Sequence, residues 1–326
     1  MSLALTMAVQ AYDRMLPLID GSVRVKGVDL TVLDLPVEET FFRMVSHEEF
    51  DVAEMSLSTY VLTLSRGAPF VAIPVFPSRA FRHSGIYVRG DSPVRDPADL
   101  AGGVVGVPEF QVTAAVWIRG ILAEHHSLPV DSVGYRTGGL DAPGRVEKIP
   151  FEPRTGLDVE PIDPGRTLSE LLVSGEIDAL HSPRNPGPLA TGRVRRLYDD
   201  APAVEARYFE QTDIFPIMHV LVIRRELYER HRWLATELLK ACTAAKTAAM
   251  AGLAETAALP YALPWLWAEV ERTRSVLGED WWPYGLEANR TVLATFLRYS
   301  HEQGLADRHY EPEELFAPEA LHSVVV

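Results

Sequence analysis

Short apolar runs alternate with amphipathic segments along the first 85 residues of the chain. Residues 38–47 carry Phe41, Phe42 and Val45 at helical spacing, which predicts a helix with one apolar face. The apolar runs around it predict strands at residues 3–11, 28–35, 50–55 and 69–75. Strands that alternate with helices in this way favour a mostly parallel sheet covered by helices.

The alternation continues after residue 85 with other boundary signals. Asp96 and Pro97 indicate a capped helical turn, and Gly175 closes a predicted helix at 167–174. Residues 134–166 are rich in glycine, proline and charge, so we expect a long irregular segment there. The other predicted elements are strands at 85–89, 104–107, 177–180 and 213–223, a helix at 111–125, and almost continuous helix after residue 225 with turns near 260, 278 and 285.

An α/β unit that is interrupted by a second unit and then resumes is the organisation of the type II periplasmic-binding-protein fold. The stretch 96–107 also resembles the segment that enters the second lobe of that fold. We therefore expect a two-lobed α/β protein with a helical C-terminal segment. Residues 1–84 and 214–326 would form the first lobe and residues 85–213 the inserted second lobe, with a small anionic ligand in the cleft between them.

Composition limits the class of protein. The 326 residues, 47% hydrophobic and 23% charged, suffice for two globular lobes. Cys242 is the single cysteine, which excludes an intrachain disulfide and fits a reducing compartment. The first ten residues lack a basic segment and resemble a strand rather than a signal peptide, so we expect a cytoplasmic protein.

The net charge of −14 argues against nucleic acid or an anionic membrane surface as a partner. No stretch approaches the ~20 apolar residues that a membrane-spanning helix needs. An anionic ligand must therefore be held by a local group of cations. The tryptophans at 265, 267, 281 and 282 could pack helices together or cover the interface of a homo-oligomer, so the number of subunits stays open.

The densest cationic run is residues 78–84, which contain Arg79, Arg82 and His83. It lies between a buried strand and the strand that would cross to the second lobe. Arginine binds carboxylates with two parallel hydrogen bonds, and histidine exchanges protons near neutral pH. A solvated basic loop is the alternative, but the position beside the predicted hinge favours a ligand site.

Two further candidates lie at strand ends or in a hinge strand. Arg184 follows the predicted strand at 177–180, and ligands of α/β folds bind beyond the carboxyl ends of strands. It could clamp an anion, or it could be a surface loop residue. His219 lies in the second crossover strand, where it could face the ligand or be a hydrogen-bonded histidine of the core.

Polar residues near other strand ends could bind the hydroxyl groups of a ligand. Glu109 and Thr113 open the predicted helix at 111–125, where free N–H groups can also hold a carboxylate; simple helix capping is the alternative. Asp13 follows the first strand, and Ser56 follows the third. Either could bond a ligand or form an ordinary turn.

Several familiar sites are absent from the sequence. There is no Walker-type phosphate loop, no Gly-x-Gly-x-x-Gly after the first strand, no Cys-x-x-Cys and no His-Glu-x-x-His. His125 and His126 are adjacent, so they point in different directions and make a poor metal pair. We therefore predict no cofactor, and leave a divalent metal open.

Longer blocks of the chain resemble the family of 4,5-dihydroxyphthalate decarboxylases, nearly from end to end. The blocks are 12–14 (YDR), 38–44 (EETFFRM), 50–56 (FDVAEMS), 76–84 (FPSRAFRHS), 113–117 (TAAVW), 175–180 (GEIDAL), 215–219 (FPIMH) and 282–285 (WPYG). Residues 181–184 depart from the family pattern in their polar start, which could alter specificity.

The resemblance implies a cytoplasmic enzyme on a binding-protein scaffold, which takes one carboxylate off a dihydroxylated aromatic diacid in phthalate degradation. A histidine would protonate the ring carbon that loses CO₂, because such an acid needs a pKa near the working pH. In this hypothesis His83 or His219 is the acid. Arg79, Arg82 and Arg184 hold the retained carboxylate. Glu109 or Asp13 polarises the ring hydroxyl.

Two alternatives remain for the function. The chain could be a non-catalytic cytosolic binding protein for a carboxylate on the same fold, since a scaffold does not fix a function. It could also be an enzyme of the same family that acts on another aromatic acid. A divalent metal chelated by the two ring hydroxyls stays open as well.

Overall fold

The computed structural model describes residues 2–321, which divide into two compact units. Unit 1 comprises the residues up to 79, residues 217–294 and the residues from 310 onward. Unit 2 comprises residues 80–216 and 295–309. Each unit is built around its own β-sheet.

The sheet of unit 1 has five strands in the order β2-β1-β3-β11-β4. The strands are β1 (Leu3–Val9), β2 (Val28–Asp34), β3 (Val52–Ser56), β4 (Phe70–Ile73) and β11 (His219–Arg224). β11 runs antiparallel to both of its neighbours, β3 and β4, while β1 is parallel to β2 and β3. The prediction of a mostly parallel sheet is therefore confirmed, with one returning strand inserted into it.

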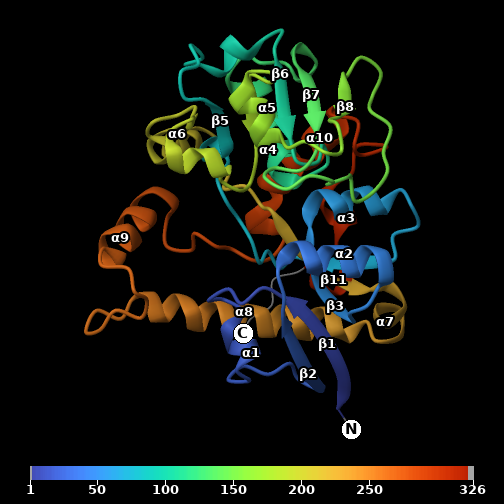
Figure 1. Ribbon diagram of the computed structural model, residues 1–326. Coiled ribbons are helices and arrows are strands. Elements are labelled where there is room, and N and C mark those ends of the chain that lie inside the picture. The colour runs from blue at the N-terminus through green and yellow to red at the C-terminus, as the bar shows by residue number, and fades with distance from the viewer. Residues whose placement is uncertain (1, 322–326) are drawn as a thin grey trace. The chain divides into compact units, whose positions relative to one another are not determined.

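Alternate residues of these strands build the core of unit 1. Met7, Ile73 and Leu221 are fully buried on the face covered by α8 (Trp233–Leu253), which contributes Leu238 and Cys242. α8 also packs against α1 (Leu16–Ile19), as Figure 1 shows. The remaining helices of unit 1 are α2 (Val37–His47), α3 (Leu57–Leu64), α7 (Arg225–Arg230) and α9 (Leu266–Leu277).

The sheet of unit 2 has six strands in the order β10-β5-β9-β6-β7-β8. The strands are β5 (Ile86–Arg89), β6 (Val104–Val107), β7 (Gly134–Thr137), β8 (Val159–Pro161), β9 (Ala179–His181) and β10 (Val194–Arg196). β5 is antiparallel to β9 and β10, whereas the pairs from β9 to β8 are parallel. The helices that accompany them are α4 (Thr113–His125), α5 (Leu168–Ser174) and α6 (Ala201–Thr212).

α5 shows how local sequence fixes an element of unit 2. Thr167 caps its first turn through the N–H of Glu170, whose carboxylate accepts from the N–H of Thr167 in return. Gly175 ends the helix with a left-handed backbone at φ 81°, as the sequence predicts. Leu168 and Leu172 of this helix pack into the core of unit 2.

Some sequence expectations differ from the structure. The segment 134–166 is not wholly irregular, because β7 and β8 form short edge-side strands within it. The strand expected from residue 213 begins only at His219, since Asp213 adopts a left-handed backbone and Pro216 precedes the strand. Phe42 of α2 is 58% exposed, while Phe41 and Met44 are buried.

Residues 295–309, which the sequence analysis assigns to the first lobe, belong with unit 2. They include most of α10 (Arg290–Glu302), whose Phe296 and Tyr299 rings lie 5.5 and 5.7 Å from that of Trp117 in α4. Helical periodicity shows which face of a helix is apolar, but it does not show which sheet that face covers.

Candidate active site

Three side chains of unit 1 form a hydrogen-bonded group that we call the Glu54 cluster: Tyr12, Glu54 and His219. Oε1 of Glu54 lies 2.6 Å from Nδ1 of His219 and 2.8 Å from the hydroxyl of Tyr12. The N–H of Gln10 donates to Oε2 at 3.3 Å. Glu54 has no exposed surface, whereas the His219 side chain is 16% exposed. Tyr12 is likewise partly exposed, so solvent or a ligand can reach the histidine and the tyrosine of the cluster but not Glu54.

Strand register brings the cluster together. β11 pairs with β3 so that His219 lies opposite Ser56 and Leu221 lies opposite Glu54. Side chains two positions apart on one strand share a face, so Glu54 and His219 are diagonal neighbours on the same face of the sheet. Tyr12 follows the end of β1, the parallel neighbour of β3. All three side chains thus lie near the carboxyl ends of β1 and β3, in the middle of the sheet.

The protonation pattern follows from the donors and acceptors. An ionised carboxylate only accepts hydrogen bonds, so Nδ1 of His219 donates its proton to Glu54. Nε2, the other ring nitrogen of His219, takes no part in this contact. Burial, followed by the charge of Glu54, raises the pKa of Tyr12 well above its usual range, so its hydroxyl stays a donor.

Asp13 and Arg14 lie beside this cluster. The Arg14 guanidinium contacts Asp13 at 2.9 Å and donates to the carbonyl of Pro77. It also lies between the rings of Tyr12 and Trp282, 4.3 and 4.1 Å from their centroids. Asp13, predicted as a substrate contact, is therefore the ion-pair partner of Arg14 in this structure.

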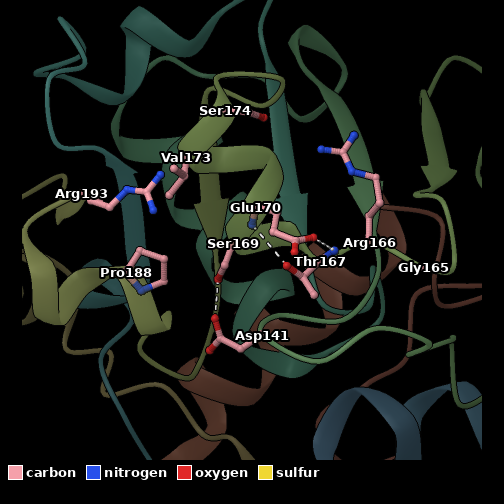
Figure 2. Close-up of a pocket in the computed structure, with 10 residues that line it drawn as sticks. All are labelled: Asp141, Gly165, Arg166, Thr167, Ser169, Glu170, Val173, Ser174, Pro188 and Arg193. Carbon is pink, nitrogen blue, oxygen red and sulfur yellow. Dashed lines mark hydrogen bonds between the residues drawn. The ribbon is translucent and has the colours of Figure 1, made fainter.

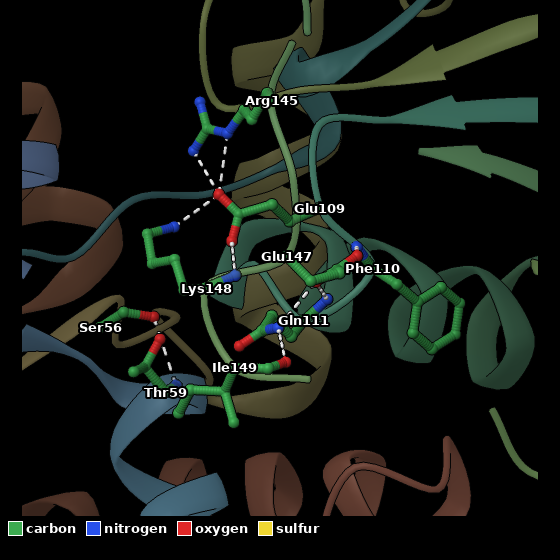
Figure 3. Close-up of polar contacts among 9 residues, drawn as sticks. All are labelled: Ser56, Thr59, Glu109, Phe110, Gln111, Arg145, Glu147, Lys148 and Ile149. Atoms are coloured by element: carbon green, nitrogen blue, oxygen red, sulfur yellow. Dashed lines mark hydrogen bonds and ion pairs between the residues drawn. The ribbon is translucent and has the colours of Figure 1, made fainter. Parts of the chain in front are cut away.

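The start of α3 lies next to His219. Ser56 caps this helix, with its Oγ 3.5 Å from the N–H of Thr59 (Figure 3). The N–H of Leu57 donates to the carbonyl of Met218, which ties the helix start to β11. Ser56 thus caps the helix and lies directly opposite His219 in the ladder of β3 and β11.

Arg79 is a buried residue of unit 1. Its guanidinium donates to the carbonyl of Pro283 at 2.9 Å and to Oδ1 of Asn289. Burial lowers the pKa of Arg79 to about 9, far below its usual value. These contacts join the 76–84 segment to the 283–289 turn, so they give Arg79 a structural role in unit 1.

Arg82 and His83 belong to unit 2, so the cationic run is divided between the units. The His83 ring is buried among three aromatic rings, those of His126, Tyr198 and Tyr208, at centroid distances of 5.1 to 6.1 Å. Burial lowers the pKa of His83 to about 4 and that of the Arg82 guanidinium to about 10. His83 is therefore neutral at pH 7, and a neutral imidazole is a poor proton donor.

Glu109 and Thr113 lie in unit 2, at the turn from β6 into α4. The Glu109 carboxylate is buried, and its Oε1 lies 2.6 Å from Arg145 and 2.5 Å from Lys148, as Figure 3 shows. Thr113 is buried at the first position of α4. Glu109 therefore holds two cations of the following loop, a pairing that the sequence does not indicate.

Arg184 lies in an exposed loop just after β9, as the sequence predicts. Its N–H donates to Oγ of Ser182 at 3.1 Å. His181, the last residue of β9, is fully buried, and burial lowers its pKa to about 3. The polar start of this loop is thus turned into the interior of unit 2.

The predicted site residues line neither the groove along α5 nor the cavity around Lys246. A groove of about 770 Å³ in unit 2 lies along α5 (Figure 2). Its polar groups satisfy one another, since Ser169 donates to Asp141 and Thr167 pairs with Glu170. A cavity of about 250 Å³ in unit 1 contains Lys246, which is bound to Asp280 at 2.8 Å.

Sequence reasoning missed the role of Glu54. One signal was present: a carboxylate in an otherwise apolar run, Val52 to Met55. Charged residues are rarely buried without partners, so a glutamate in a buried strand predicts a polar network around it. The identity of its partners, Tyr12 and His219, depends on strand pairing between distant segments.

Within residues 2–321, no helix is long and apolar enough to cross a membrane. In the same residues, the His, Cys, Asp and Glu side chains form no group of three or more that could hold a metal ion.

Solved structures with a similar fold support the fold prediction. The periplasmic aliphatic sulphonate-binding protein SsuA of Escherichia coli has a TM-score of 0.54 and 16% identity, covering 98% of this chain and 99% of its own. A putative sulfonate-binding SsuA of Methylobacillus flagellatus has a TM-score of 0.56 and 12% identity, with coverage of 98% and 92%. The desulfurization enzyme DszB in complex with biphenyl-2-sulfinic acid has a TM-score of 0.52 and 16% identity, covering 98% of each chain. The periplasmic-binding-protein-like fold is confirmed.

Sequence relatives decide the family. No family model matches the chain. A 4,5-dihydroxyphthalate decarboxylase of Pseudomonas putida is 44% identical over 201 residues, which cover 61% of this chain and 78% of that protein. A 4,5-dihydroxyphthalate decarboxylase of Comamonas testosteroni is 41% identical over 324 residues, 98% of each chain. As its sequence blocks predict, the chain belongs to the 4,5-dihydroxyphthalate decarboxylase family of carboxy-lyases.

Proposed function

We propose that this chain removes one carboxylate from 4,5-dihydroxyphthalate or a closely related dihydroxylated aromatic diacid, with His219 as the proton donor. The observation that carries this assignment is the Glu54 cluster, in which a buried carboxylate orients a partly exposed imidazole. Family membership supplies the class of reaction, and the cluster supplies the acid that the reaction needs.

The reaction exchanges a carboxylate for a proton. The ring hydroxyl para to the departing carboxylate donates electron density, and the carbon that bears this carboxylate takes up a proton. The bond to the carboxylate carbon then breaks, its electron pair returns to the ring, and CO₂ leaves. One proton is consumed and one CO₂ is released, and the product is a dihydroxybenzoate.

His219 can supply this proton from Nε2. A cationic imidazole carries protons on both nitrogens, and Nδ1–H remains bound to Glu54 before and after the transfer. The charge of Glu54 stabilises the cation and fixes the plane of the ring. The edge of Phe41 against the His219 ring, at a centroid distance of 4.9 Å, holds the same orientation. Proton donors of this kind contribute about 10²- to 10⁴-fold to the rate.

Recognition of the diacid requires cations, which the acidic chain must provide locally. Arg82 and Arg184 remain our predicted contacts for the retained carboxylate, while Thr113 remains a predicted hydroxyl contact. The departing carboxylate should be held weakly, because a strong clamp would stabilise the ground state. We also propose a cytoplasmic location, which a single buried cysteine supports.

The test is CO₂ release by purified, EDTA-treated protein given 4,5-dihydroxyphthalate, with and without added Mg²⁺ or Mn²⁺. Release in both conditions supports decarboxylation by proton transfer alone. Release only with metal keeps the reaction and changes the proposed mechanism. Tight binding without release would instead make the chain a carboxylate-binding protein or an enzyme for another aromatic acid.

The histidine assignment needs two variants. His219→Asn should depress kcat about 10²-fold or more with little change in substrate binding. His83→Asn should leave kcat near that of the wild type, because His83 is buried in unit 2 with a lowered pKa. The opposite result would move the proton donor to His83.

A further inference from the structure

The turn from β6 into α4 holds a carboxylate of the chain itself. Oε1 of Glu147 accepts the N–H of Phe110 at 2.5 Å. Oε2 accepts the N–H of Gln111 at 3.4 Å and its side-chain Nε2 at 2.7 Å. Backbone and amide donors thus converge on one carboxylate from the side of α4 (Figure 3). A ligand carboxylate would need the same donors.

A deeply buried cation beside this turn has a donor left over. Among the described residues, Nη1 of Arg119 has no hydrogen-bond partner, although Arg119 is only 2% exposed. Arg119 donates to the carbonyl of Phe110 at 2.6 Å, so its positive charge lies directly behind the turn. A buried cation without a carboxylate in contact is costly, and an anion in front of it reduces that cost.

The segment that carries Glu147 lies across the turn and is attached to it at several points. Glu109 of the turn binds Arg145 and Lys148 of this segment. The ring of Phe151 stacks on that of Phe110 at 5.4 Å, with an interplanar angle of 14°. We call residues 142–151 the strap. Gly144 in the strap has φ 87°, a conformation that other residues rarely adopt and that suits a bend.

The surroundings of Glu147 disfavour the charged form of its carboxyl group. Burial raises the pKa of the Glu147 carboxyl, and the nearby negative charge of Glu109 raises it further. The strap therefore inserts a carboxylate next to another carboxylate, in a place that offers three donors. A soluble carboxylate that binds the same donors would take the place of Glu147 when the strap moves away.

We propose that the β6–α4 turn is a carboxylate-binding site and that Glu147 is its internal occupant, displaced when an aromatic dicarboxylate binds. The ligand carboxylate takes the N–H groups of Phe110 and Gln111 and the Gln111 amide, with Arg119 behind them. The identity of the ligand as a phthalate rests on the proposed function; the displacement does not. The strap then acts as an autoinhibitory segment that lowers the apparent affinity.

Competition of this kind has a measurable size. When a competing group occupies a site, the apparent Kd rises by the reciprocal of the fraction of molecules whose site is open. Glu147→Gln removes the charge and turns one oxygen into a donor that faces other donors. If Glu147 fills the site in nine molecules of ten, the variant should bind a carboxylate about tenfold more tightly. Glu152→Gln is the matched control, because Glu152 is exposed and only five positions further along the chain.

The probe is phthalate, which has both carboxylates and lacks the ring hydroxyl that the proposed decarboxylation requires. Calorimetry on the full-length protein should give a Kd about tenfold lower for Glu147→Gln than for the wild type, and an unchanged Kd for Glu152→Gln. A Kd of the Glu147 variant that is equal to or higher than that of the wild type would overturn the proposal. Because phthalate binding is measured without turnover, this outcome is independent of whether CO₂ is released.

A second measurement needs no variant. Trypsin cleaves after Arg145 and Lys148, which are held by Glu109 in the closed strap. Saturating phthalate should accelerate cleavage at these two positions severalfold in the wild-type protein. Unchanged or slower cleavage there would show that the strap is not displaced, and would refute the proposal even if the Glu147 variant failed to fold.

Discussion

Replacement of Glu54 by glutamine perturbs the proposed acid without changing the shape of the site. Glu54 accepts from His219 Nδ1, the Tyr12 hydroxyl and the Gln10 N–H at 2.6, 2.8 and 3.3 Å. Glutamine keeps one acceptor oxygen and introduces an NH₂ group. One of the three donors must then face another donor, or His219 must turn its ring or change its tautomer.

Glu54→Gln should change both the free energy of unfolding and kcat. A buried donor left without a partner costs about 1–3 kcal/mol, so Glu54→Gln should lower the free energy of unfolding by that amount. Without the carboxylate the imidazolium of His219 loses its stabilising charge and its orientation. General acids contribute about 10²- to 10⁴-fold, so kcat should fall by about a hundredfold while the Kd for phthalate changes little.

The assay compares kcat for CO₂ release with the urea midpoint of the same variants. Asp51→Asn is the matched control. Asp51 precedes β3 and accepts from the N–H and hydroxyl of Thr6 at 2.9 and 3.1 Å and from Arg224 at 2.6 Å. Its loss should also lower the free energy of unfolding, by about 1–2 kcal/mol, because the same number of contacts is disturbed at a side chain that is 20% exposed. It should leave the kcat of the folded enzyme unchanged.

A role of Glu54 in proton transfer is refuted if the two variants behave alike. Equal kcat values for Glu54→Gln and Asp51→Asn, at substrate saturation and below the unfolding transition, would mean that Glu54 only stabilises the sheet. The proton would then have to come from a group other than His219. Loss of phthalate binding without loss of kcat would likewise place Glu54 in recognition rather than in proton transfer.

Buried groups outside the Glu54 cluster should control stability and leave turnover unchanged. Arg79→Gln should lower the free energy of unfolding by about 2 kcal/mol, because its interior contacts are lost. The Kd for phthalate should not change, and weaker binding by a fully stable variant would contradict this. The pKa of His83 falls from 6.5 to about 4 on folding, so the stability it contributes is complete above pH 6.5 and is lost as the pH falls toward 4. That loss is about 3 kcal/mol, and urea midpoints should depend less on pH in His83→Phe; an identical pH dependence would contradict it. Gly120→Ala would place a Cβ 2.1 Å from Cδ2 of Tyr299 and should lower the free energy of unfolding by about 1–3 kcal/mol. Gly252→Ala has open space around it and should be neutral or stabilising. Equal melting temperatures of the two variants would contradict the packing of Gly120 against Tyr299.

The fold was predictable because it rests on local signals. The apolar run at 3–9 and the capped helix closed by Gly175 can be recognised without knowing what they contact. The location of residues 295–309 in unit 2 was not predictable in this way. It depends on Tyr299 meeting Trp117 and Gly120, which are more than 170 residues away along the chain.

The candidate site was predictable in part for the same reason. His219 is a candidate from the sequence because it lies in the predicted second crossover strand, whereas its contact with Glu54 depends on the register of β11 on β3. The pairing of Glu109 with Arg145 and Lys148 required a loop whose course no periodicity describes. Sequence patterns therefore supply the reactive residue types, and tertiary pairing decides which of them act together.

The carboxylates of Asp51, just before β3, and of Glu54, within it, show how structure separates chemistry from stability. Each accepts from three donors, although the Asp51 side chain is 20% exposed and that of Glu54 is fully buried. Asp51 accepts from a threonine and from a permanently charged arginine, and the arginine cannot give up a proton at neutral pH. One of the partners of Glu54 is a histidine, a residue type that can exchange protons, and its side chain is 16% exposed. The partner thus distinguishes the Asp51–Arg224 ion pair from the proposed catalytic pair of Glu54 and His219, so exchange of the partner, rather than removal of the carboxylate, is what would abolish the proposed chemistry while the sheet stays intact.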